Sequence, residues 1–423
     1  MPDKKKILIC DDETDRSNEW KDKLELIDGL SAEFDVIAAT HDDIKTGVQI
    51  LEVRSKDMRN GSGEWKGDCI FDQAEILVVD YDLLDLSDVG DFLTGDKIAY
   101  FARVFSRVGY IVVVNQFGTN EFDLSLTRDA LARADLNIGD IQLSNPGLWR
   151  QPFEGFRPWY WPILPTAVRD LGRRWEDLKA HGALEQPILD FLGFRKRAVI
   201  NRIPSSAAQW LCAGCRDVDK KPDQILADLS FRDFVLHSGV AIDRKDAEAI
   251  KDSGRDDILV RVAASVVYKW LERQILVAQD LLIDAPHLIE RMPLLLDGDV
   301  KSLECWNLTT SLEDPTGVNA VCQKHAFEKT HWLSRPAYWW PMVEDDPDIA
   351  KILSSGKGIY PDFVFREDVS DFKPQSDSRE FRAEVNGLFN RRFVSNTQAR
   401  AGAGEDPRDT SNVVYSPSVR LAM

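Results

Sequence analysis

The chain has 423 residues, a formal net charge of −18 and a hydrophobic content of 43%. Its length is enough for two or three domains. An acidic chain repels phosphate backbones, so charge-driven binding to nucleic acid is not expected. No run of about 18 apolar residues is present, so no membrane span is expected either.

The cysteines and the first residues indicate a cellular compartment. Six cysteines in a chain of this length do not indicate a disulfide framework. The opening Met-Pro-Asp-Lys-Lys-Lys lacks the apolar core of a secretory signal. The composition therefore predicts a cytoplasmic protein with reduced thiols.

Two short apolar runs near the N-terminus each end in aspartate. Ile7–Cys10 leads into Asp11 and Asp12, and Ile76–Val79 leads into Asp80. Each run has the length of a buried parallel strand, and ligands of open α/β sheets lie at the carboxyl ends of such strands. Carboxylates that converge there need a cation, and Mg²⁺ takes oxygen ligands. An aspartate in this position also suits nucleophilic attack on phosphorus.

The other elements of the first 148 residues alternate between helix and strand. Apolar spacing predicts helices at about 14–28, 41–56 and 95–106, and strands at about 34–39, 111–114 and 141–144. The segment at about 57–73 contains Gly and Asn of loop type and is expected to be an insertion. The order predicts an α/β fold with a doubly wound, parallel, five-stranded sheet.

This order of elements, together with its three acids, resembles a response-regulator receiver domain over residues 1–148, which has a flavodoxin-like sheet. The resemblance implies that Asp11 and Asp12 bind Mg²⁺ and that Asp80 is the phosphoacceptor. It also implies that Asp82 lends its backbone carbonyl to the metal.

Two positions depart from the family's pattern. The Thr or Ser that ends the fourth strand is replaced by Asn115, whose amide can still donate a hydrogen bond. The Lys-Pro that ends the fifth strand is replaced by Asn145-Pro146, and asparagine cannot supply a charge-assisted contact. Arg150 is the next arginine along the chain.

Residues 149–165 form a connector rich in aromatic residues and proline. Flexible linkers are poor in aromatic residues, so an ordered, packed connector is expected. Residues 166–423 are predicted to form a mainly helical α+β domain of unrecognised type with a few short strands. The strongest helix pattern covers about 256–282.

The connector contains a motif that recurs further along the chain. Arg157–Pro162 resembles Arg335–Pro341, because each places Arg-Pro before a cluster of aromatic residues closed by proline. Arginine stacks on aromatic rings, so one interpretation is a binding surface. The other, which we favour, is that both are packing corners of one core, because large aromatic residues dominate core burial.

A second constellation combines Cys212 and Cys215 with Cys322 and His325. Three sulfurs and one imidazole are a valid zinc set. The alternative is that the cysteines are ordinary buried small hydrophobes, because Cys212 lies in an apolar helical run. We favour this alternative over zinc.

The resemblance implies an atypical response regulator that accepts a phosphoryl group on Asp80 from a histidine kinase or phosphotransfer protein in a two-component phosphorelay. Its output would be a contact with a protein effector, self-association, or phosphate buffering, by analogy in an antiphage relay. No Gly-rich phosphate loop, nucleophile elbow or His-Glu-x-x-His motif is present, so no other enzyme activity is expected. The alternatives are a non-phosphorylated pseudo-receiver scaffold, which Asn115 and Asn145 favour, and a receiver fused to an unrecognised effector enzyme.

Overall fold

The computed structural model describes residues 4–83, 86, 93–114, 133–180, 182–194, 197–215, 222–313, 315–355, 360–382 and 391–395. The N-terminal part contains a five-stranded sheet with the order β2-β1-β3-β4-β5, in which all neighbours are parallel. Its strands are β1 (Lys5–Cys10), β2 (Phe34–Ala38), β3 (Ile76–Asp80), β4 (Tyr110–Val114) and β5 (Leu136–Ile138). The predicted α/β fold with a doubly wound parallel sheet is confirmed, and its strand order is that of flavodoxin-like folds.

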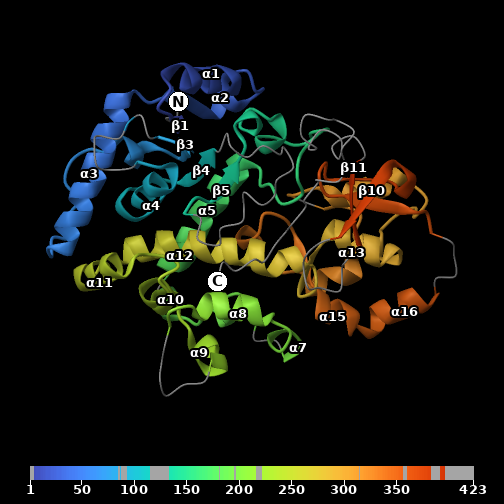
Figure 1. Cartoon of the computed structure of the whole chain (residues 1–423). Helices are drawn as coiled ribbons and strands as arrows, with labels where there is room; N and C mark the ends of the chain where they lie inside the picture. Colours follow the sequence, from blue (N-terminus) through green and yellow to red (C-terminus); the bar gives the residue numbers. More distant parts are fainter. Residues whose placement is uncertain are drawn as a thin grey trace.

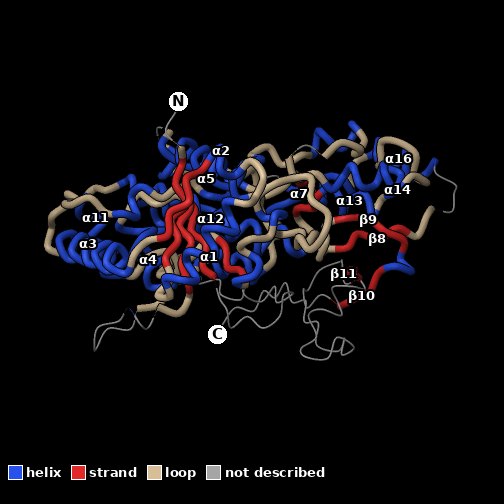
Figure 2. The backbone as a smooth tube through the Cα atoms, turned by 90° about the horizontal axis from the view of Figure 1, so that it is seen from above, coloured by secondary structure: helices blue, strands red, loops and turns tan. Residues whose placement is uncertain are grey.

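Helices cover both faces of this sheet, which explains why its central strands are continuous apolar runs. They are α1 (Thr14–Glu25), the short α2 (Leu30–Glu33), α3 (His41–Arg59), α4 (Gly95–Phe105) and α5 (Leu164–Lys179). The chain leaves β1 toward β2 and then crosses back to β3, so right-handed crossovers place α1 on the face opposite α3 and α4. Figure 2 shows α3 and α4 on one side of the strands. Every residue of β3 and β4 is buried.

The fifth strand was predicted in the wrong place. It lies at Leu136–Ile138 and pairs with β4, whereas Asp140–Gln142 form a 3-10 turn. Asp135 fixes this choice, because its carboxylate accepts a hydrogen bond from the backbone N–H of Ile111 at 2.8 Å and pairs with Arg103. The alternation of apolar and polar residues is similar in both segments, so periodicity alone did not separate them.

The remainder of the chain is mainly helical with two small sheets. Its helices are α6 (Ile188–Phe191), α7 (Arg197–Ile200), α8 (Ser205–Cys212), α9 (Pro222–Asp228), α10 (Phe231–His237), α11 (Arg244–Ser253), α12 (Asp256–Trp270), α13 (Ala285–Arg291), α14 (Leu303–Asn307), α15 (Trp340–Glu344) and α16 (Pro347–Ser355). Its strands are β6 (Leu282–Asp284), β7 (Ala337–Trp339), β8 (Phe363–Arg366), β9 (Asp371–Pro374), β10 (Ser378–Arg382) and β11 (Arg391–Ser395). The predicted helix at 256–282 ends as an α-helix at Trp270 and continues as a π-helical turn over Leu271–Ile275.

Helix α12 contacts the segment that leads directly into β5, the edge strand of the large sheet. Figure 1 shows α12 running below β5 and α5. Ser265 Oγ donates to the Asp135 carboxylate, and Lys269 Nζ donates to the carbonyl oxygen of Ala134 at 3.0 Å. These two contacts fix the start of the edge strand against α12.

The connector is ordered and packed, as expected. The backbone N–H of Trp159 donates to the carbonyl oxygen of Glu367 at 2.7 Å. The backbone N–H of Arg157 donates to the carbonyl oxygen of Asp368 at 2.9 Å. The two similar motifs meet, because the Arg335 guanidinium lies 4.6 Å from the centre of the Trp159 ring. Arg157, Trp159, Arg335 and Trp339 are all buried, so the interpretation as packing corners is confirmed.

Apolar side chains from the sheet and from the helical part belong to one buried core. The predicted boundaries at 148 and 165 stay a prediction. Within the described ranges, no helix combines the length and the hydropathy that crossing a bilayer requires.

Candidate functional site

The site lies where the strand order of the sheet reverses. β2 and β3 both neighbour β1, and β1 and β3 run parallel with Cys10 opposite Val79. Asp11 follows Cys10 directly and Asp80 is the last residue of β3. Both acids therefore lie at the carboxyl ends of the parallel strands. Ligands of open α/β sheets bind at such a switch point.

Three carboxylates meet at the carboxyl ends of β1 and β3. Asp11, Asp12 and Asp80 each offer an oxygen, and these oxygens all lie within 4.8 Å of one another. Asp11 is 0% exposed and Asp80 is 1% exposed, whereas Asp12 is partly exposed. The open side of the cluster is therefore the side on which Asp12 lies.

The buried oxygens of the cluster are incompletely hydrogen-bonded. Asp11 Oδ1 accepts from the backbone N–H of Glu13 at 2.7 Å. Within the part of the chain that the structure describes, Asp11 Oδ2 and both carboxylate oxygens of Asp80 have no hydrogen-bond donor. Burying carboxylate oxygens without hydrogen-bond donors is costly, and these oxygens are available to a cation. Carboxylate oxygens in this arrangement fit Mg²⁺, which binds proteins through a few carboxylates and keeps several waters.

Burial, with repulsion from neighbouring carboxylates, raises the pKa of the two buried acids, Asp11 and Asp80. Burial, reinforced by the charge of Asp11, raises the pKa of Asp80 to about 7. Burial likewise raises the pKa of Asp11 to about 6, although the N–H of Glu13 and the charge of Arg16 oppose it. These are the shifts expected when carboxylates share a dry site.

Sequence reasoning missed Arg16, which lies in the first turn of α1. Its guanidinium pairs with Glu13, its Nε lies 3.7 Å from Asp11 Oδ2, and its NH1 lies 3.6 Å from Asp80 Oδ2. A signal for it was present, because a helix that starts at Thr14 places its first turn beside the end of β1. The spacing of three residues from Glu13, the N-cap of α1, is also that of a helical ion pair.

The structure corrects the assignment of Asn145. This residue does not end the fifth strand, because β5 ends at Ile138 and is followed by Gly139 and Asp140. The Asn145 side chain accepts from the N–H of Gly147 at 2.8 Å and donates to the carbonyl oxygen of Phe156 at 2.7 Å. It therefore caps the 3-10 turn of Pro146–Leu148, which directly precedes the connector.

The other candidate positions have different outcomes. Asn115 lies outside the described residues. Asp82 forms a β-bridge with Thr94 directly before α4, and its role as a backbone ligand stays a prediction.

The zinc set is not assembled. Cys212, Cys215, Cys322 and His325 are all described, yet no three of them bring ligand atoms within 4.8 Å of one another. His325 Nε2 instead contacts Asp346 Oδ2 at 2.6 Å, and Cys322 is buried. None of the six cysteines forms a disulfide.

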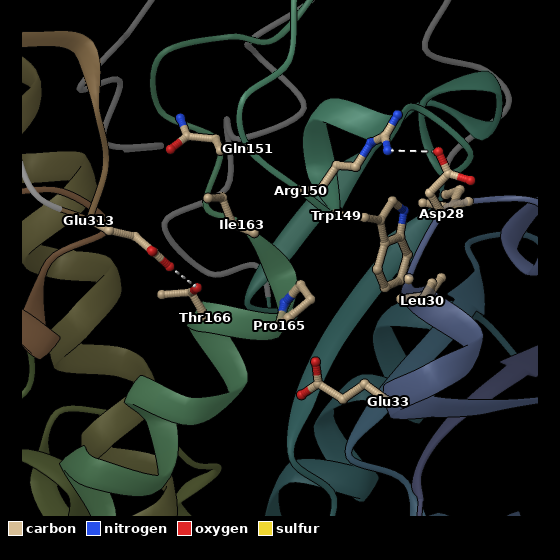
Figure 3. A pocket seen from close by; sticks show the side chains of 12 residues that line it. Asp28, Leu30, Glu33, Trp149, Arg150, Gln151, Ile163, Pro165, Thr166 and Glu313 are labelled. Atoms are coloured by element: carbon tan, nitrogen blue, oxygen red, sulfur yellow. Dashed lines mark hydrogen bonds and ion pairs between the residues drawn. The ribbon is translucent and has the colours of Figure 1, made fainter. Parts of the chain in front are cut away.

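A separate pocket of about 240 Å³ lies between the N-terminal part, the connector and the start of α5 (Figure 3). Arg150 pairs with Asp28 at 3.0 Å on one side of it, and Thr166 donates to Glu313 at 2.9 Å on the other. Arg150 is therefore committed to this pocket and does not compensate for the missing lysine at the acid cluster.

Comparisons with protein-family models, with curated proteins and with solved structures find no match for this chain.

Proposed function

We propose that residues 1–148 act as a receiver-like domain in which Asp80 accepts a phosphoryl group while Asp11, Asp12 and Asp80 hold Mg²⁺. The observation that carries the proposal is the meeting of the three acids at the switch point of the parallel sheet. The resemblance in the order of elements and acids points the same way.

The reaction would form one bond and break one. A carboxylate oxygen of Asp80 forms a P–O bond, the P–N bond of a phosphohistidine donor breaks, and its electron pair returns to the imidazole. Because Asp80 is buried and Asp12 and Arg16 are partly exposed, the donor approaches on the side of the latter two. Mg²⁺, when bound, supplies the positive charge that offsets the charge of the transferring group.

The chain's own residues prepare Asp80 for this step. The N–H of Glu13 fixes the Asp11 carboxylate beside it, and the N–H of Tyr81 donates to the carbonyl oxygen of Val114 at 2.8 Å, which fixes the backbone after β3. A nucleophile held by rigid elements loses little entropy on reaction. The partner of this reaction would be a histidine kinase or phosphotransfer protein, and the output a protein contact or storage of the phosphoryl group.

One observation favours a second candidate, a pseudo-receiver scaffold that takes no phosphate. The guanidinium of Arg16 already lies between Asp11, Glu13 and Asp80, so the acids are partly neutralised by the chain itself. Such a site could be a purely structural charge cluster.

Incubation of the full chain with acetyl phosphate and Mg²⁺ separates the two candidates. We expect intact-mass spectrometry to show the gain of one phosphoryl group on the wild type and none on Asp80→Asn. A folded wild type that gains no phosphoryl mass, or gains that are equal in both proteins, would contradict the proposal and favour the scaffold.

A further inference from the structure

We infer that Arg16 is the residue that binds the phosphoryl group on Asp80 and positions it through a charge-assisted contact. This inference rests on the function proposed above and names a residue for it. It is carried by the geometry of the guanidinium, by the charge of the acid cluster and by the residues that the structure describes at the end of β5, none of which is a cation.

The guanidinium of Arg16 is held on two sides and directed toward Asp80 on the third. Glu13 pairs with one terminal nitrogen, and Asp11 Oδ2 lies 3.7 Å from Nε. The remaining nitrogen, NH1, lies 3.6 Å from Asp80 Oδ2 and is itself buried. Among the residues that the structure describes, NH1 has no hydrogen-bond acceptor.

This separation is too long for a hydrogen bond to the free carboxylate. A phosphoryl group on that carboxylate would extend its oxygens beyond Oδ2 and so bring acceptors to the unused donor. Arginine presents its donors in a planar fork that matches carboxylate and phosphoryl oxygens. One end of the fork can therefore stay paired with Glu13 while the other meets the phosphoryl group.

The negative charge of the acid cluster requires that the phosphoryl group contact a cationic side chain. An acyl phosphate on Asp80 carries about two negative charges in place of the one on the free carboxylate. One divalent cation offsets only part of the charge that this group makes together with Asp11 and Asp12. At the end of β5 the chain supplies Gly139 and Asp140, and Asn145 and Arg150 are committed elsewhere. Within the described ranges, Arg16 is the residue whose positive charge acts on Asp80.

Lysine would replace this function only in part. Its ammonium is a point charge without a fork, so it cannot pair with Glu13 and reach Asp80 at the same time. The graded series Arg16, Arg16→Lys and Arg16→Gln therefore separates positive charge from fork geometry.

The test measures beryllofluoride binding by ¹⁹F NMR on the full chain in saturating Mg²⁺, with Mg²⁺ affinity titrated separately. We expect Arg16→Gln to weaken beryllofluoride binding by about 10- to 100-fold, the range of a charge-assisted hydrogen bond, and Arg16→Lys to lie between it and the wild type. Mg²⁺ affinity should not fall, because the substitution removes a neighbouring positive charge. Arg244→Gln removes an arginine whose side chain is 91% exposed, and it should bind like the wild type.

The outcomes distinguish this inference from the function on which it rests. Wild type and Arg16→Gln that bind beryllofluoride equally would overturn the role of Arg16 and leave the phosphoacceptor intact. Equal losses of Mg²⁺ and beryllofluoride affinity would show a structural role and also overturn it. A wild type that binds no beryllofluoride and takes no phosphoryl group would overturn the function itself. If Arg16→Gln does not fold, Arg16→Lys decides, and wild-type affinity in that variant contradicts the inference.

Discussion

A methyl group on Gly95 would lie 2.3 Å from the backbone carbonyl oxygen of Asp80. The N–H of Gly95 also donates to the carbonyl oxygen of Tyr81 at 2.9 Å. The first residue of α4 therefore packs directly on the backbone that carries the proposed phosphoacceptor. A side chain at this position must displace either the helix or the acid.

Gly95→Ala should destabilise the protein by about 1–3 kcal/mol, the usual range for overpacking a rigid site. It should also weaken Mg²⁺ binding, because Asp80 shifts relative to Asp11. Denaturant unfolding and Mg²⁺ titration check the two effects. Gly172→Ala is the matched control: its added methyl group meets nothing within 4 Å inside α5, and it should stabilise by about 0.5–1 kcal/mol. An unchanged free energy of unfolding in Gly95→Ala would show that α4 yields freely.

Asp80→Asn should stabilise the metal-free protein at pH 8. Burial raises the pKa of Asp80 to about 7 from its ordinary value of 3.8, so the folded state binds the proton more tightly than the unfolded state. The wild type therefore loses stability as the pH rises from about 4 through 7, because Asp80 must ionise in the folded state. Asparagine does not ionise, so the variant does not lose this stability. We expect a gain of the order of 1–3 kcal/mol at pH 8 that shrinks toward pH 4.

Mg²⁺ should reverse this difference. A ligand that binds only the folded state stabilises it, and Asp80→Asn removes one of the metal's oxygen ligands. Thermal unfolding of wild type and Asp80→Asn measures the stability difference without Mg²⁺ and its reversal with Mg²⁺. A wild type that is not stabilised by millimolar Mg²⁺ would contradict the metal site.

A buried imidazole in the C-terminal part should make stability depend on pH in the alkaline range. His287 Nδ1 lies 2.7 Å from Asp284 Oδ1 and Nε2 lies 3.1 Å from Glu367 Oε1, and all three side chains are buried. Burial opposes the charged form, but the two carboxylates outweigh it and raise the pKa of His287 to about 9.

A raised histidine pKa stabilises the folded state below the ordinary value of 6.5, and the effect is lost as the pH rises through about 9. The free energy of unfolding of the wild type exceeds that of His287→Gln at low pH. This difference should narrow by about 3 kcal/mol between pH 6.5 and 10. Urea unfolding across this range measures it. A difference in the free energy of unfolding that does not depend on pH would refute a charged His287.

Asp135 joins the large sheet to α12, and its removal should loosen both. Its carboxylate meets Arg103, Ser265 and the N–H of Ile111, all buried. Asp135→Ala leaves Arg103 as a buried charge without this partner, which should cost about 3–5 kcal/mol. Ser265→Ala, which removes one neutral partner, should cost only about 1 kcal/mol.

Hydrogen exchange tests whether the loss is local. In Asp135→Ala, protection should fall first in β5 and in α12 and later in β1 and β3. A uniform loss across the sheet would show instead that α12 is not a separate support for the β5 edge.

The acids were predictable because a local rule places them. A buried parallel strand is an apolar run, and the first charged residue marks its end, so Asp11 and Asp80 could be located from the sequence. The start of α3 was equally local, since Thr40 and Asp43 form a capping box. That these acids meet followed from strand order, which the spacing of the elements indicated.

The position of the fifth strand, and the contact of Arg16 with Asp80, depended on tertiary contacts. The local signal placed Arg16 only beside the end of β1. β5 is a three-residue edge strand, and an alternation that short also occurs at 141–144. The choice was made by Asp135 reaching back to Ile111 and Arg103. Arg16 entered the site because helix α1 returns over the end of β1, which brings its guanidinium within reach of an acid that lies 64 residues further along the chain.

The amino-acid sequence determined where the buried strands β1, β3 and β4 stop, because a continuous apolar run reports burial along a single element. Only the tertiary structure decided which charge lies beside which, because pairing between distant elements depends on how helices cross the sheet. The positions of the acids could therefore be read from the sequence, whereas the contact of Arg16 with Asp80 was decided by the tertiary structure.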